Sequence, residues 1–139
     1  MDLYLGGKVV VVTGGSRGIG RSICQIFSQE GAKLVINFFR HEQEAKKVVN
    51  IVEKSGSQAI AVKANIEERK AVEKMVQKSL DKFERIDVLV NNAGINISGS
   101  ITTITEKEWD KVLRNHLNGT FNCTQVIIPY MIKQRYGKI

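Results

Sequence analysis

The chain has 139 residues, of which 42% are hydrophobic and 25% are charged, and its formal net charge is +7. These values are typical of one globular domain that is long enough to bury a core. No apolar run reaches the length of a membrane span, and the N-terminus lacks the pattern of a signal peptide. The sequence therefore predicts a cytoplasmic protein without membrane contact.

The positive charge and the cysteines indicate no particular partner. Lysines are scattered among glutamates at helical spacing, as on solvated helix faces, and there is no zinc-finger spacing or RNA-binding aromatic motif. We therefore expect neither nucleic-acid binding nor a metal site. Cys24 and Cys123 are far apart in the sequence, and we expect each to fill a helix face as a small apolar residue.

Four short runs of β-branched residues alternate with segments of helical periodicity. Each run is nearly all apolar, which is typical of parallel strands covered on both faces. The runs are KVVVVT at 8–13, KLVINF at 33–38, QAIAVK at 58–63 and IDVLVN at 86–91. A fifth strand is expected to begin at Lys138, where the chain ends.

Apolar stripes predict a helix after each of these strands. The first three stripes lie within residues 19–27, 45–52 and 72–83. Thr105 and Glu108 form a capping box that begins a fourth helix, and a fifth is expected over residues 119–135 with a kink at Pro129. The fourth helix would carry one apolar face made of Trp109, Val112, Leu113, His116 and Leu117.

This alternation predicts an α/β fold with a doubly wound parallel sheet and right-handed crossovers. We expect one Rossmann-type domain over residues 1–139, incomplete after the fourth strand and its following helices. Strand four would then form an apolar sheet edge that is able to pair with another chain.

A glycine loop, TGGSRGIG at residues 13–20, joins the first strand to the first helix. Gly14 permits a sharp turn, Gly18 permits close approach of the backbone to a pyrophosphate, and Gly20 permits tight packing of the helix on the sheet. The helix N-terminus offers free N–H groups and partial positive charge to phosphates. An ordinary tight turn is the alternative, but the position between strand and helix favours phosphate binding.

The spacing of these glycines and NNAG at residues 91–94 resemble the short-chain dehydrogenase/reductase family. Asn65-Ile66 after the third strand and WDKVLRN at 109–115 extend the resemblance over the whole chain. The sequence is most similar to bacterial 3-oxoacyl-[acyl carrier protein] reductases and to the related sugar dehydrogenases.

The resemblance implies a Rossmann fold that binds a nicotinamide cofactor. The glycine loop would contact its phosphates, the segment after strand three its adenine, and NNAG its ribose. Many members have Asp where this chain has Asn65, whose amide can still bond to the adenine. The implied cofactor-binding residues are Gly14, Ser16, Arg17, Gly18, Ile19, Gly20, Asn65, Ile66, Asn92, Ala93 and Gly94.

The end of the second strand favours NADP over NAD. A carboxylate there would bind the 2′-hydroxyl of the ribose and repel a 2′-phosphate, but none appears in INFFRHEQE before Glu42. Arg40 follows the strand and Arg17 lies in the glycine loop, so two arginines are available for a 2′-phosphate. In the family, arginine at the position of Arg17 tends to accompany NADP; the alternative is that Arg40 is merely solvated.

The implied chemistry is hydride transfer between nicotinamide and a carbonyl or alcohol. In the family a Tyr-x-x-x-Lys pair supplies the proton, a serine orients the carbonyl, and an asparagine positions a relay water. Asn115 matches that asparagine, and His116 is expected to be an ordinary helix-face residue. The serine and the Tyr-x-x-x-Lys segment are absent, because Tyr4 and Lys8 match only by accident, before the first strand.

Three functions remain open from the sequence. The first is an NADPH-dependent reductase of 3-oxoacyl thioesters or similar small ketones, which forms a homodimer or homotetramer in its full-length form. The second is a sugar or polyol dehydrogenase of the same fold. The third is a non-catalytic module that binds NADP or docks to a partner.

Overall fold

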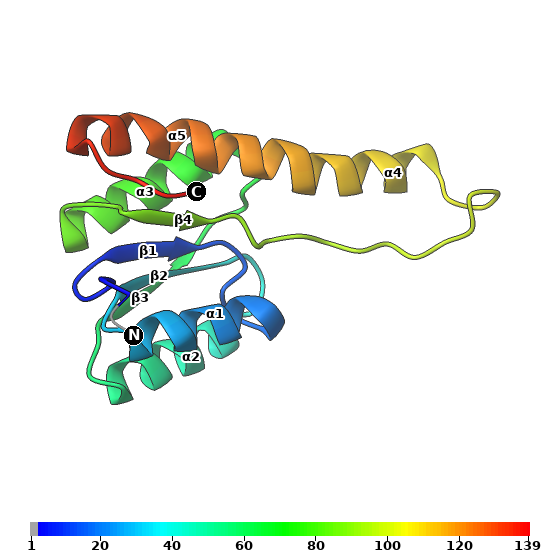
Figure 1. Cartoon of the computed structure of the whole chain (residues 1–139). Helices are drawn as coiled ribbons and strands as arrows, with labels where there is room; N and C mark the ends of the chain where they lie inside the picture. The colour runs from blue at the N-terminus through cyan, green and yellow to red at the C-terminus, as the bar shows by residue number, and fades with distance from the viewer. Residues whose placement is uncertain (1–2) are drawn as a thin grey trace.

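The computed structural model describes residues 3–139, so residues 1 and 2 of the predicted domain lie outside it. It contains a parallel four-stranded sheet of order β3-β2-β1-β4, flanked by helices (Figure 1). The elements in chain order are β1 (Val9–Val12), α1 (Gly18–Gln29), β2 (Lys33–Phe38), α2 (Glu42–Lys54), β3 (Ala59–Lys63), α3 (Arg69–Phe83), β4 (Val88–Val90), α4 (Glu106–Leu113), the π-helical segment η1 (Arg114–Asn118) and α5 (Gly119–Gln134).

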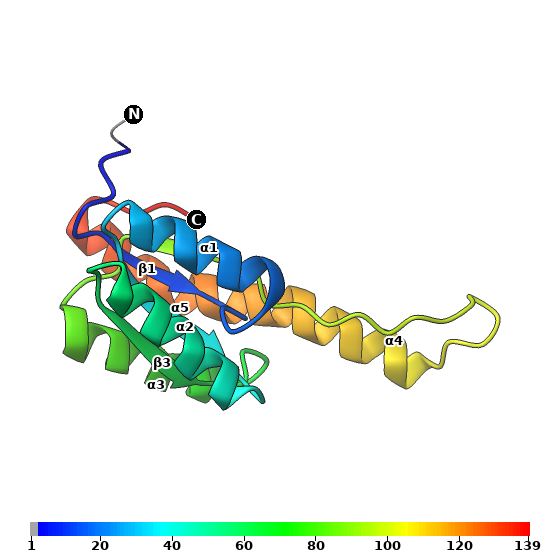
Figure 2. The ribbon, with the colours of Figure 1, turned by 90° about the horizontal axis from the view of Figure 1, so that it is seen from below.

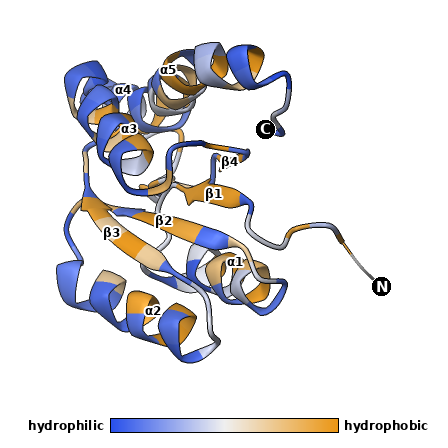
Figure 3. Ribbon diagram, turned by 90° about the vertical axis from the view of Figure 1, so that its left-hand side faces the viewer, coloured by the Kyte–Doolittle hydropathy of each residue, from blue (hydrophilic) through white to orange (hydrophobic). Residues whose placement is uncertain are grey.

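Alternate residues of the strands face two apolar layers, which confirms the doubly wound α/β fold. On β1, Val9 and Val11 belong to the core beneath α3 and α5, whereas Val10 and Val12 belong to the core beneath α1 and α2. Figure 3 shows the apolar strands as a layer between these helix pairs. The β-branched runs form strands here because both pleat faces are covered.

The cysteines are interior apolar residues, as predicted. Cys24 lies in the core beneath α1 and α2, and Cys123 lies in the core on the other side of the sheet. Burial raises the pKa of each thiol to about 12. Both thiols are therefore protonated at neutral pH and are poor nucleophiles.

The last two predicted helices are one continuous helical arm. Leu113, Arg114 and Gly119 all have helical backbone angles, so α4, η1 and α5 follow one another without a break, and α5 continues through Pro129. The capping box of Thr105 and Glu108 is present at the start of α4. Figures 1 and 2 show α4 extending beyond the sheet beside the 94–105 loop.

The expected apolar face of α4 is present but uncovered. No residue of α4 is buried, and Trp109 and Leu117 are 53% and 63% exposed. The periodicity of the sequence therefore predicts the apolar face correctly. No other part of the described chain buries this face, because α4 lies past the end of the sheet. Within residues 3–139 no helix is both long enough and apolar enough to cross a membrane.

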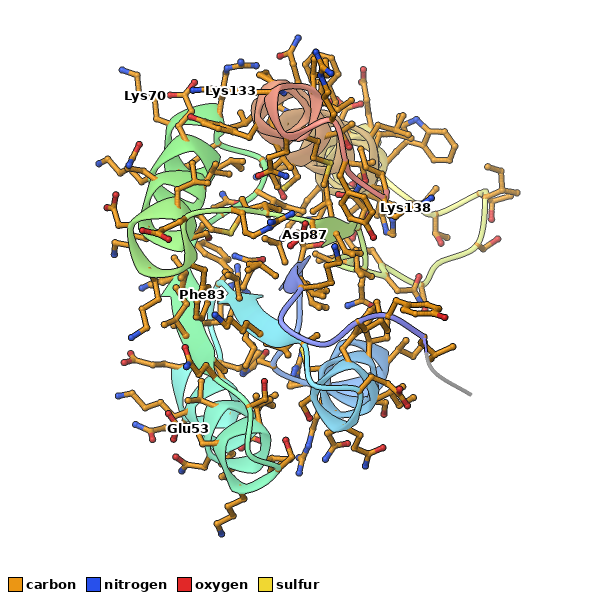
Figure 4. All side chains as sticks on the ribbon, turned by 60° about the vertical axis from the view of Figure 1, so that its left-hand side comes forward. Glu53, Lys70, Phe83, Asp87, Lys133 and Lys138 are labelled. Atoms are coloured by element: carbon orange, nitrogen blue, oxygen red, sulfur yellow. The ribbon has the colours of Figure 1, made fainter. Side chains whose placement is uncertain are left out.

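The end of the chain lies beside β4, where the expected fifth strand is represented by one isolated bridge. Lys138 forms a parallel bridge to Val88, with backbone hydrogen bonds from Leu89 N–H to Lys138 O and from Lys138 N–H to Asp87 O, both 3.0 Å. The Asp87 carboxylate is fully buried, accepts from Val9 N–H at 3.0 Å and pairs with Arg85 at 2.5 Å. Figure 4 shows Asp87 inside the fold, while Glu53 and Lys70 lie at its periphery.

Replacing Asp87 by Ala should lower the free energy of unfolding by about 2–4 kcal/mol, because it leaves the Val9 N–H without its acceptor in the interior. Urea denaturation followed by circular dichroism measures the loss. The control is Asp81→Ala, which removes an exposed carboxylate bonded to Gln77 on α3. Equal stability of the two variants would contradict a role for Asp87 in joining β1 to β4.

Candidate functional site

The carboxyl ends of the four strands open into one cleft of about 800 Å³. Its walls come from the segments that follow β1, β2, β3 and β4, and from the α4–η1 arm. Every residue that the sequence predicted for cofactor binding or catalysis lines this cleft, namely Gly14, Ser16, Arg17, Gly18, Ile19, Gly20, Arg40, Asn65, Ile66, Asn92, Ala93, Gly94 and Asn115.

The glycine loop leads into an open helix N-terminus. Gly14 and Gly18 have positive φ angles of 62° and 50°, and α1 begins at Gly18. A Cβ at Gly18 would meet no atom within 4 Å, so the space before it is open. The first N–H groups of α1 have no intrahelical acceptor and carry the positive end of the helix dipole, which is a suitable environment for an anion.

The NNAG segment is bonded to the glycine loop. The Thr13 hydroxyl accepts the N–H groups of Asn92 and Ala93, each at 3.0 Å, and the Asn92 amide donates to Thr13 O at 2.9 Å and Gly14 O at 3.2 Å. A Cβ at Gly20 would lie 2.3 Å from Gly14 O. Gly20 therefore allows α1 to approach the sheet, as the sequence predicted.

A second wall is formed by residues 64–67 after β3. Asn65 caps the turn into α3, since its side-chain oxygen accepts the Glu67 N–H at 3.2 Å. Ile66 is 5% exposed and its backbone oxygen accepts from the buried Asn122 amide at 2.9 Å. This wall thus combines the buried Ala64 and Ile66 with the partly exposed Asn65 and Glu67.

The far end of the cleft, after β2, is basic. Arg17, Arg40 and His41 line it together with Phe39, whose ring centre lies 5.6 Å from the Arg40 guanidinium. Neither arginine forms a salt bridge within residues 3–139. The first carboxylate after β2, on Glu42, is bonded to Lys46 at 2.9 Å; that hydrogen bond and its charge hold the pKa of Glu42 below its usual value.

The opposite end of the cleft is formed by the helical arm. Asn115 lies in the π-helical segment, a type of segment that is frequent at functional sites. Its amide donates to the Glu67 carboxylate at 2.9 Å, and its oxygen is buried without a partner in the described part of the chain. His116 is an exposed residue of this segment, and its Nε2 lies 2.8 Å from Ile95 O, with the ring against Gly94.

A family model for short chain dehydrogenase matches residues 8–139. The chain belongs to the short-chain dehydrogenase family. Its sequence is 39% identical over 132 residues to the 3-oxoacyl-[acyl-carrier-protein] reductase FabG of Staphylococcus epidermidis, covering 95% of this chain and 54% of that protein.

Similar identities are found in distant organisms. The 3-oxoacyl-[acyl-carrier-protein] reductase of Synechocystis sp. is 39% identical over 95% of this chain and 53% of its own length. The FabG reductase of Thermotoga maritima is 38% identical over 99% of this chain and 55% of its own length. The chain thus spans about half the length of the curated relatives that it matches.

Tyr4 and Lys8, which match the Tyr-x-x-x-Lys spacing, are not among the residues that line the cleft. Lys8 precedes β1, whereas the glycine loop follows it, so the two are at opposite ends of the strand. The Lys8 ammonium instead lies 4.1 Å from the ring centre of Tyr136. The spacing match is therefore accidental, as predicted. Within residues 3–139 no three His, Cys, Asp or Glu side chains are grouped as metal ligands.

Sequence reasoning missed several residues of the cleft. Asn37 and Glu67 line it, and so do Phe39, His41 and Lys111. Asn37 carried a usable signal, because it is the only uncharged polar residue in the apolar run KLVINF. Lys111 and Glu67 carried none, since isolated charges on helices are ordinarily solvated.

Proposed function

We propose that this chain provides the NADP(H)-binding part of an oxidoreductase that transfers a hydride between nicotinamide and a carbonyl or alcohol. The observation that carries the proposal is one cleft lined by an open glycine loop at the N-terminus of α1 and by two arginines, Arg17 in that loop and Arg40 after β2, which form no salt bridge within residues 3–139. Membership of the short-chain dehydrogenase family also supports an oxidoreductase function.

The residues of the cleft fit such a cofactor. The open space at Gly18 and the first N–H groups of α1 would hold the pyrophosphate. The wall around Ile66 would cover the adenine, and Asn92 to Gly94 would line the ribose beside nicotinamide. When bound, the nicotinamide supplies or accepts the hydride.

The basic end supports NADP(H) over NAD(H). Arg17 and Arg40 would bind a 2′-phosphate by charge-assisted hydrogen bonds. An NAD site would have a carboxylate there for the 2′-hydroxyl, and within the described residues no Asp or Glu lines that end of the cleft.

The proposed reaction is reduction of a 3-oxoacyl thioester or similar ketone, on the strength of the names of the relatives. Asn115 is proposed to position a relay water, because its buried side-chain oxygen has no partner within the described residues and is available to accept a hydrogen bond from that water. The serine and Tyr-x-x-x-Lys of the family would complete the site. In a full-length form that carries these residues, turnover of NADPH with a 3-oxoacyl thioester, compared with turnover of NADP with a polyol, distinguishes this reaction from that of a sugar dehydrogenase.

We also propose that copies of the protein associate through the helical arm as a homodimer or homotetramer. Large apolar side chains lie exposed along it at helical spacing. They are Trp109, Leu113, Leu117, Phe121, Ile128 and Ile132. An exposed apolar stripe of this kind is typical of an interface.

Replacing Arg40 by Asp should weaken NADPH binding about tenfold or more and leave NADH binding within about twofold, because it replaces attraction to the 2′-phosphate by repulsion. Fluorescence titration of both cofactors measures the change. Lys78→Asp on α3 alters the net charge equally but lies away from the cleft. Unchanged NADPH affinity in the Arg40 variant would refute the NADP assignment.

Replacing Gly18 by Leu should abolish binding of both cofactors, because the side chain would occupy the space of the pyrophosphate. The fold should persist, since only the positive φ is strained, at a cost of about 1–3 kcal/mol. The matched control is Gly7→Leu, which also has positive φ, at 73°, and open space around it but lies outside the cleft. Retained binding by a folded Gly18 variant would exclude a phosphate loop.

The double variant Phe121→Glu with Ile132→Glu should sediment at a lower mass than the unmodified protein, because two charges would be buried in the proposed interface. Analytical ultracentrifugation measures this mass. The control is Ile26→Glu, which changes a 60% exposed side chain on α1. An oligomer of unchanged mass in the double variant would place the interface elsewhere.

A further inference from the structure

One buried amide connects two walls of the cleft. Asn37 is 2% exposed and precedes Phe38, the last residue of β2. Its side chain lies between the glycine loop, which follows β1, and the segment that follows β3. These are the two walls that would hold the phosphates and the adenine.

On the side of the glycine loop, Asn37 accepts two consecutive N–H groups. Its side-chain oxygen accepts from Gly14 at 3.3 Å, and its backbone oxygen accepts from Gly15 at 2.9 Å. The first turn of the loop is therefore bonded to β2. The N–H groups at the start of α1 are left to face the cleft.

On the other side, the Asn37 amide donates to residues at the end of β3. The nearest acceptor is Ala64 O at 3.1 Å, and Val62 O lies at 3.4 Å. A backbone hydrogen bond also joins β2 to the segment after β3, since Ala64 N–H donates to Phe38 O at 2.9 Å. Ala64 is followed directly by Asn65 and Ile66, which form the wall proposed for the adenine.

These contacts require a donor and an acceptor on one short side chain. Aspartate would keep the acceptor for Gly14 but lose the donor to Ala64, and alanine would lose both. Glutamine adds a methylene to a buried site, where extra volume causes strain. Asparagine is thus the residue whose chemistry and length fit both walls.

We propose that Asn37 is a positioning residue of the cofactor cleft, which sets the spacing between the glycine loop and residues 64–66 and thereby the affinity for the adenosine half of a dinucleotide. This inference rests on the proposed function. Because Asn37 acts through backbone geometry, its loss weakens NADPH and NADH alike. It thus differs from Arg40, which is proposed to discriminate between them.

The test compares Asn37→Ala with two variants that lower stability at residues outside the cleft lining. Ser79→Ala removes a buried hydroxyl bonded to Met75 O within α3, and Met75→Ala opens a cavity in the core. Equilibrium titrations with NADPH, NADH and adenosine 2′,5′-bisphosphate are made well below the melting temperature of every variant. The bisphosphate lacks nicotinamide and therefore reports on the adenosine half alone.

Asn37→Ala should lower the affinity for all three ligands by about tenfold and leave the ratio of NADPH to NADH affinity unchanged within about twofold. Both control variants should bind the ligands with the affinity of the unmodified protein. Unweakened binding by Asn37→Ala, or the same weakening in Met75→Ala, overturns the positioning role and leaves the proposed function standing. Failure of the unmodified protein to bind any of the three ligands overturns both.

Discussion

The cleft depends on how closely helix α1 approaches the carboxyl end of β1. At Gly20 the helix lies so near Gly14 O that even a methyl group would clash, and the Asn92 amide fills the remaining space by donating to the same oxygen. This contact aims the N-terminus of α1 into the cleft. It also joins the glycine loop after β1 to the NNAG segment after β4.

Three buried or half-buried asparagines connect the segments around the cleft by hydrogen bonds. Asn92 bonds the NNAG segment to the glycine loop, Asn37 bonds that loop to the end of β3, and Asn122 bonds the same region to helix α5. Each amide satisfies backbone groups at strand ends, where the ladder of the sheet stops. The cleft is therefore preformed by protein contacts, which lowers the ordering cost of binding a ligand.

Much of this organisation could be predicted from the sequence, because it rests on local patterns. The valine runs, the spacing of the glycines and the capping box of Thr105 act within a few residues, and each was found where predicted. The exposure of α4, the continuity of the arm and the contact of His116 with Ile95 could not be predicted. They depend on where the helix lies relative to the sheet, which periodicity does not encode.

The same distinction applies to function. The part of the cleft that is proposed to bind a dinucleotide consists of backbone geometry and small residues, and these requirements produce recognisable sequence patterns. Other residues of the cleft, such as Asn96 and Lys111, come together only through the fold. Those residues carried no signal of their own.

The most direct test of the central claim is hydrogen–deuterium exchange of the protein with and without NADPH. Our account predicts slower amide exchange on binding in residues 14–20, 64–67 and 92–94, and little change in α2 and in the C-terminal half of α3. Unchanged exchange at the glycine loop, or protection confined to another surface, would contradict the assignment of this cleft as a cofactor site.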